Sequence, residues 1–195
     1  MLWDVGSPDT PTSVAFSPDG QKLVTGWGSE TLENWGRIIF WRINTKSPAQ
    51  MTGTQQIVSG GKCNIQSVAY SPDGQIVVSG SWGYSRRVRK GINEPHLYYG
   101  ELRFVNARTG KLLRVIKTRS EGINTVAFSP DGKLLATTAI TRYSNVVVRL
   151  RNASTGQLLH TIGLNKPGTA VAAFSPDGSV LAIGRRDGMV TMWNV

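Results

Sequence analysis

The sequence predicts an all-β fold made of four repeated units of antiparallel strands. The main observation is a seven-residue string, Val-Ala-Phe-Ser-Pro-Asp-Gly, that occurs four times in near-identical form, at 14–20, 68–74, 126–132 and 172–178. Short runs of β-branched and aromatic residues follow each copy, as expected for buried strands. The chain has 195 residues, of which 39% are hydrophobic and 17% charged, and this composition argues against a disordered protein.

Each copy of the string predicts a β-hairpin. A first strand ends at the aromatic residue, and Ser-Pro-Asp-Gly then reverses the chain, because proline presets φ at the second turn position and glycine accepts the conformation that follows. Second strands are predicted directly after the turns, at 22–26, 75–80, 133–138 and 179–184.

Two further strands complete most units. Third strands are predicted at 37–42, 102–106, 147–152 and 189–194. Fourth strands are predicted after Thr-Gly turns at 111–116 and 157–162, with a weaker equivalent at 55–58. Each unit is therefore expected to be a four-stranded antiparallel meander, and the last unit has only three strands of its own.

The repeat has a constant core period, although successive turns lie 54, 58 and 46 residues apart. Insertions of 6, 16 and 4 residues between second and third strands, with 6 more after the first unit's third strand, leave a period of 42. We expect one domain over 1–195, with units at about 12–60, 61–119, 120–165 and 166–195. Residues 1–5 are a candidate for completing the last unit.

These features resemble the WD-repeat β-propeller family, whose repeats of about 40–45 residues each form one blade. The resemblance rests on the four strings, the Thr-Gly turns, the Asp187-Gly188 turn before 189–194, and third strands ending near Trp41 and Trp193. It implies a rigid, non-catalytic scaffold for protein–protein interaction, without a cofactor.

The sequence also departs from that family. The family's histidine position, ten residues before the first-strand aromatic, holds Gly6, Gly60, Thr118 and Leu164. No complete unit keeps the Trp-Asp pair at the end of its third strand. The hydrogen-bonded network that family members build from the histidine, the turn aspartate and the tryptophan is therefore expected to be absent or much reduced.

Closure of the propeller is left open by the sequence. Residues 1–5 fall in register with the fourth strands and would supply the missing strand of the last blade, which hides a sheet edge. Four blades lie at the low end of the propeller range. The alternatives are an open part of a larger propeller, or half of a propeller that a second copy completes by self-association.

Positive charge is concentrated in the second unit. The chain carries a net charge of +10, and residues 82–119 contribute +8 of it, from ten basic and two acidic residues. The insertion at 81–100 mixes four basic residues with four aromatics. The candidate partner-binding residues are Trp82, Tyr84, Arg86, Arg87, Arg89, Lys90, Tyr98, Tyr99, Arg185 and Arg186.

Three interpretations of this insertion remain. Arg, Tyr and Trp anchor protein interfaces, which favours an acidic protein or peptide partner. The alternative is nucleic acid or another polyanion, with phosphates neutralised by Arg and Lys and bases stacked on tyrosines. The structural alternative is a solvated insertion whose aromatics pack on their own blade, its charge partly neutralised by the acidic loop at 27–35. Arg185 and Arg186 are interpreted mainly as an exposed turn.

The sequence offers no catalytic or metal-binding constellation. Cys63, His96 and His160 are isolated, and Cys63 beside Lys62 is expected to be a free thiol at the surface. The recurrent aspartates are explained by their turns: Asp19, Asp73, Asp131 and Asp177. Because no apolar run approaches the roughly 20 residues of a membrane span and no secretory signal is evident, we expect a cytoplasmic protein.

Overall fold

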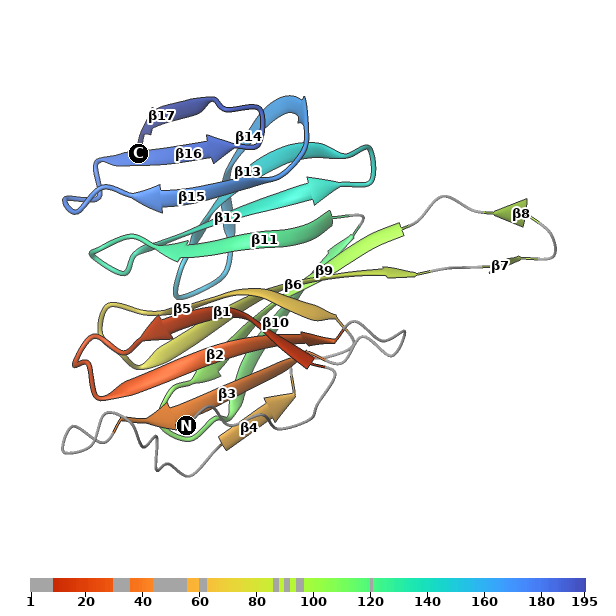
Figure 1. Ribbon diagram of the computed structural model, residues 1–195. Coiled ribbons are helices and arrows are strands. Elements are labelled where there is room, and N and C mark those ends of the chain that lie inside the picture. The colour runs from red at the N-terminus through yellow and green to blue at the C-terminus, as the bar shows by residue number, and fades with distance from the viewer. Residues whose placement is uncertain are drawn as a thin grey trace.

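The computed structural model describes residues 9–29, 36–43, 56–59, 63–85, 88–89, 92–93, 97–119 and 121–195. These residues form strands and turns only, and the strands make four antiparallel sheets stacked face to face (Figure 1). The predicted all-β, four-unit architecture is confirmed. We call the sheets blades one to four in chain order.

Each blade is a meander of neighbouring antiparallel strands. Blade one contains β1 (Asp9–Phe16), β2 (Lys22–Ser29), β3 (Arg37–Arg42) and β4 (Gln56–Ser59). Blade two contains β5 (Asn64–Tyr70), β6 (Ile76–Ser85), β9 (Leu97–Asn106) and β10 (Leu112–Arg119). Blade three contains β11 (Glu121–Phe128), β12 (Leu134–Thr141), β13 (Asn145–Asn152) and β14 (Leu158–Pro167). Blade four contains β15 (Ala170–Phe174), β16 (Val180–Arg185) and β17 (Val190–Asn194). A separate hairpin pairs β7 (Val88–Arg89) with β8 (Ile92–Asn93).

The Ser-Pro-Asp-Gly turns share one hydrogen-bonded design. In the first, the Ser17 hydroxyl donates to Asp19 Oδ1 at 2.5 Å, and the Gln21 amide donates to the same oxygen at 3.0 Å. Gly20 has φ of 69°, in the left-handed region that glycine accepts readily. The other three turns repeat these contacts, which confirms the turn role of the aspartates.

Apolar side chains fill the space between successive blades. At the first junction, Ile38 and Phe40 of blade one cluster with Val68 and Tyr70 of blade two. A serine reinforces the contact, because the Val68 amide donates to Ser13 Oγ at 3.1 Å. The same hydrogen bond recurs at the second junction, where the Val126 amide donates to Ser67 Oγ at 3.1 Å.

Close approach of the blades requires glycine on the second strand. A Cβ at Gly26 would lie 2.5 Å from Ile65 Cγ2, and a Cβ at Gly80 would lie 2.6 Å from Ile123 Cγ2. Any side chain at these positions would push the next blade away. The Gly that ends each predicted second strand in blades one and two is therefore a packing requirement.

The described blades form an open stack. Blade one and blade four lie at opposite ends of the molecule, separated by blades two and three (Figure 1). Within the described ranges blade four has three strands. The proposed completing segment, residues 1–5, lies outside the described residues.

Candidate functional site

The turns between second and third strands emerge at one end of the stack, on the right in Figure 1. The end is marked by the long extension of β6 and β9 and by the shorter β12–β13 and β16–β17 turns. We call it the insertion rim and define it by residues 81–85, 97–100, 141–145 and 185–189. It holds the described candidate residues except Arg89, which lies in β7.

The long insertion is built as a hairpin, although the sequence suggested a loop. Pairing of β6 with β9 continues outward through Gly83–Tyr99, Tyr84–Tyr98 and Ser85–Leu97. Further out, β7 pairs with β8. Strand pairing therefore extends the second blade well beyond its neighbours (Figure 1).

The structure describes only part of the predicted basic cluster, and for that part it describes the backbone alone. Arg89 lies in β7, and the backbones of Tyr84 and Tyr98 pair in register on β6 and β9. Arg86, Arg87 and Lys90 lie outside the described residues, as do residues 30–35 of the acidic loop. The basic cluster therefore stays a prediction from the sequence.

Two of the predicted aromatic anchors are half-buried and have packing roles. A Cβ at Gly122 would lie 2.7 Å from Trp82 Cβ and 3.2 Å from its Cε3, so Trp82 packs closely against the first strand of blade three. A Cβ at Gly83 would lie 3.0 Å from Tyr99 Cζ, so Tyr99 lies over its own blade. Burial raises the pKa of the Tyr99 phenol. Packing of Trp82 and Tyr99 within the protein agrees better with the interpretation of a structural insertion than with that of partner-binding anchors.

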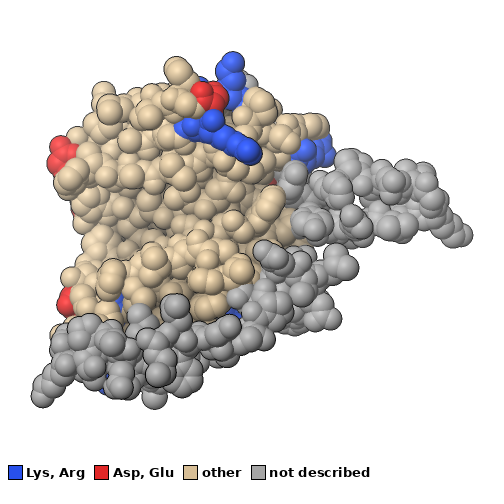
Figure 2. All heavy atoms as spheres, in the orientation of Figure 1, with Lys and Arg blue, Asp and Glu red and all other residues tan. Residues whose placement is uncertain are grey.

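The paired arginines of blade four differ from each other. Arg185 donates from Nε to Asp187 Oδ1 at 3.1 Å and lies at 2.9 Å from Oδ2 through Nη2, so its charge is largely neutralised. Arg186 is exposed, as the interpretation of an exposed turn requires. Figure 2 shows Lys and Arg side chains gathered over this end of the upper two blades.

A third element of the rim was not predicted. On the β12–β13 turn, the Arg142 guanidinium lies 4.6 Å from the centroid of the Tyr143 ring and also contacts its hydroxyl. Both side chains are exposed. The sequence shows a four-residue insertion in this turn, but it does not indicate which of the turn's side chains are exposed.

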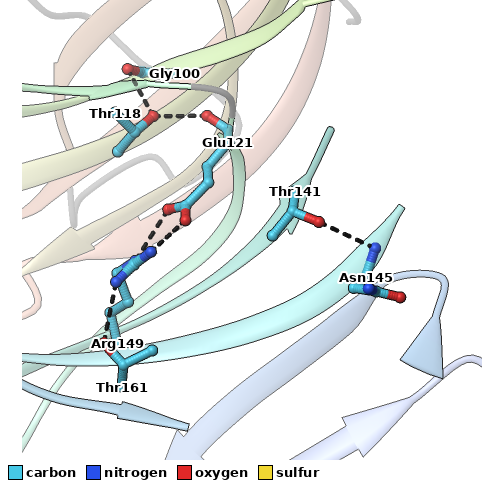
Figure 3. A network of polar contacts seen from close by, with 7 residues as sticks. All are labelled: Gly100, Thr118, Glu121, Thr141, Asn145, Arg149 and Thr161. Carbon is cyan, nitrogen blue, oxygen red and sulfur yellow. Dashed lines mark hydrogen bonds and ion pairs between the residues drawn. The ribbon is translucent and has the colours of Figure 1, made fainter. Parts of the chain in front are cut away.

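A polar network next to the insertion rim joins blade two to blade three (Figure 3). The Glu121 carboxylate holds the Arg149 guanidinium through both oxygens, with Nε–Oε2 at 2.9 Å. Arg149 Nη1 also donates to Thr161 Oγ1 at 3.0 Å. Thr118 Oγ1 lies 2.9 Å from the Gly100 carbonyl and 2.6 Å from the Glu121 carbonyl, one on each blade. The network fixes the base of β9 and β10 against β11.

Comparison with known proteins settles the family. The model of the WD domain, G-beta repeat, matches residues 5–41, 53–89, 110–145 and 156–194, which is more than half of the chain. The chain belongs to the WD40 repeat family. WD40 repeats generally mediate protein–protein interactions, and domains of this kind are typically non-catalytic.

Solved structures support the fold. The chain is similar to a chain of Kuenenia stuttgartiensis hydrazine synthase, with a TM-score of 0.69 and 15% sequence identity. The match covers 95% of this WD40 chain and 58% of that chain, so this chain spans somewhat more than half the length of the similar structure. No curated protein matches the sequence.

In the first WD40 blade, Trp41 takes part in a polar contact with the second strand. Trp41 Nε1 and Trp27 Nε1 donate to Thr25 Oγ1 at 2.8 and 2.7 Å. In the second blade Val105 occupies the register position of Trp41, and Ser79, the equivalent of Thr25, is buried with no hydrogen-bond partner for its hydroxyl among the described residues. These contacts do not include the family's histidine position or turn aspartate, and Gly6 and Gly60 lie outside the described residues, so the expected reduction of that network stays a prediction.

In the third WD40 blade an arginine replaces the tryptophan. Arg151 is buried, donates from Nη1 to the Gly156 carbonyl at 3.1 Å and leaves Nε without a partner in the described structure. Desolvation lowers its pKa, and the neighbouring Arg149 acts in the same direction. Thr118, which stands at the family's histidine position, bridges two blades as described above.

The prediction of a surface thiol is wrong. Cys63 is 1% exposed, and burial raises its pKa to about 11. The polar residues around Cys63 suggested an exposed position, but Cys63 directly precedes β5 and its thiol interacts with the Ser81 side chain. Such a thiol is protonated at neutral pH and poorly suited to nucleophilic chemistry. His160 is exposed on β14, and His96 lies outside the described residues.

The described residues offer neither a metal site nor a membrane-spanning helix. These residues contain no group of three or more His, Cys, Asp or Glu side chains placed to hold a metal ion. They also form no helix long and apolar enough to cross a membrane.

Proposed function

We propose that this WD40 domain is a non-catalytic scaffold that binds an acidic protein or peptide through the insertion rim. The observation that carries the proposal is the exposed Arg142–Tyr143 stack, which lies at the same end of the blades as the projecting β6–β9 hairpin and the exposed Arg186 (Figure 1). Arginine and tyrosine are enriched among residues that dominate binding energy at interfaces. A hairpin that projects beyond the sheets adds reach to this surface.

Charge supports the acidic character of the partner. Residues 82–119 carry a net charge of +8, and the hairpin segment 86–90 includes four of these basic residues. Complementary charge speeds association and selects partners more than it adds affinity. The anchors are then the aromatic and arginine side chains, with the basic hairpin steering the encounter.

The proposal is tested by removing the hairpin charge and, separately, an equal charge elsewhere. The test variant replaces all four basic residues of the hairpin by alanine at once: Arg86, Arg87, Arg89 and Lys90. The control is Arg42, Arg108, Lys111 and Lys133→Ala, which removes four exposed basic side chains from the opposite end of the sheets. Quantitative affinity purification should show partners lost with the hairpin variant and retained with the control. Equal retention by both variants contradicts the assignment of the rim.

A second candidate function is polyanion binding, favoured by the same concentration of charge. Phosphate contacts release counterions, so the logarithm of the binding constant falls linearly with the logarithm of salt concentration. Fluorescence anisotropy with a poly(dT) oligonucleotide measures this slope directly. A steep dependence of oligonucleotide binding on salt that is lost in the hairpin variant supports the polyanion function. Weak oligonucleotide binding that the variant leaves unchanged favours the protein partner instead.

A further inference from the structure

Neighbouring blades meet through two equivalent sets of apolar positions. We call the side of a blade that packs on the next blade its forward face, and the other side its backward face. On the forward face of blade one, Ile38 and Phe40 are buried against Val68 and Tyr70 on the backward face of blade two. The same positions meet at the next two junctions: Leu102 and Phe104 with Val126, and Val148 and Leu150 with Ala172.

The forward face of blade four has the same positions, and no other blade of the described structure packs on it. Strand register places Val190 and Met192 opposite Gly184 and Ala182, as Ile38 and Phe40 lie opposite their partners in blade one. Val190 is 66% and Met192 74% exposed, whereas their equivalents in the other blades are buried. Val171 on β15 is exposed as well. This end of the stack is an uncovered half of a blade interface.

The backward face of blade one is the complementary half. Val14 and Phe16 occupy the positions of Val68 and Tyr70 in the repeated string, yet they are 60% and 64% exposed. Val68 and Tyr70 are buried because blade one covers them. Blade one has no preceding blade within the described structure, so no described blade covers Val14 and Phe16.

We propose that the forward face of blade four packs against the backward face of blade one of a second copy, and reciprocally, to give a two-chain ring of eight blades. Each copy carries both halves of an interface that the chain already forms three times internally. The two halves lie at opposite ends of one chain, so one copy in this arrangement does not join them (Figure 1).

General rules of assembly agree with this ring. Clusters of exposed apolar side chains mark interaction surfaces in folded proteins. A contact between two different surfaces closes into a ring when the rotation between copies allows it, and eight blades lie within the range of known propellers. The proposal concerns the two end faces and does not depend on the binding role of the insertion rim.

The oligomeric state tests the proposal. Light scattering after size-exclusion chromatography should give twice the 21.2 kDa of one chain. A mass of 21.2 kDa at all concentrations overturns it, and this is also the result expected if residues 1–5 close a four-blade ring. Growth into species larger than two chains overturns the closed ring.

Single substitutions distinguish the head-to-tail contact from other dimers. Phe16→Glu and Met192→Glu each place a charge on one end face, and both side chains are exposed in a single chain, so folding should be preserved. Both variants should lose the compact two-chain ring, with the circular dichroism spectrum unchanged. Leu113→Glu is the control, because it adds the same charge to an exposed site on β10 away from both faces. If either end-face variant keeps the ring, or if the control also loses it, the assignment of the faces is wrong.

Discussion

Thr25 and Ser79 occupy the same position in two successive blades and have opposite surroundings. Thr25 accepts hydrogen bonds from two tryptophans, whereas the buried Ser79 hydroxyl has no partner in the described structure. The difference comes from the facing strand, where Trp41 in one blade is replaced by Val105 in the next. An unpaired buried hydroxyl costs free energy, while a paired one stabilises the fold.

This contrast predicts opposite effects of two small substitutions. Thr25→Val should lower the free energy of unfolding by about 1–3 kcal/mol, because two indole N–H groups lose their acceptor. Ser79→Ala should leave stability unchanged or raise it, because the hydroxyl it removes is unsatisfied. Urea unfolding of both variants measures the difference. Equal destabilisation by the two substitutions would show that the hydrogen bonds of Thr25 have no net value.

Cys63 gives a second prediction for a single residue. Its pKa of about 11 against an ordinary value of 9.0 lowers the thiolate population about 100-fold at neutral pH. Modification by Ellman's reagent should therefore be at least about 100-fold slower in the native protein than in urea. Cys63→Ser provides the blank. Rapid, stoichiometric labelling of the folded protein would contradict the burial of this thiol.

At the scale of the elements, the four Ser-Pro-Asp-Gly turns act as one repeated titratable device. Hydrogen bonds from the serine hydroxyl and a backbone amide favour the ionised carboxylate, which lowers the pKa of Asp19, Asp73 and Asp131. The same contacts, with an added bond from Ser179, lower the pKa of Asp177 to about 2 from an ordinary 3.8. A lowered folded-state pKa means that ionisation stabilises the fold above the unfolded pKa.

The turns therefore predict acid sensitivity with a definite sign. Stability should be constant above about pH 5 and fall as the pH drops toward 2, where the turn carboxylates become protonated. The Asp177→Asn variant keeps an acceptor oxygen and does not titrate. Its urea midpoint should fall less steeply with acid than that of the wild-type chain. If the urea midpoints of the two proteins fall in parallel with pH, the Asp177 carboxylate does not contribute to acid sensitivity.

The strands were predictable where the repeat defines them. The third strand predicted at 37–42 coincides with β3, and the weak fourth strand at 55–58 is present as β4. The hairpin in the insertion was missed because Gly, Arg and Pro there hide the pairing of Tyr84 with Tyr98. Burial of Cys63 was missed because it follows Gly-Gly-Lys, a run typical of surface connections. Both outcomes depend on contacts between segments, which local composition does not reveal.

At the scale of the whole molecule, each of the first three blades buries its forward face on the following blade, as in other repeat proteins whose units contact only their neighbours. Apolar positions that are buried at three internal junctions are therefore exposed at the two ends. The repeat itself predicts which residues these are. That they lie uncovered at opposite ends of an open stack is known only from the arrangement of the blades.

The most direct test of these complementary ends mixes the two end-face variants. The Phe16→Glu chain keeps an intact forward face on blade four, and the Met192→Glu chain keeps an intact backward face on blade one. In each protein alone, both interfaces of the ring contain one altered face. In a mixed pair, one of the two interfaces is formed by two unaltered faces. Light scattering should show a species of twice 21.2 kDa in the mixture and a single-chain mass for each variant alone. A mixture that stays at 21.2 kDa would contradict the account.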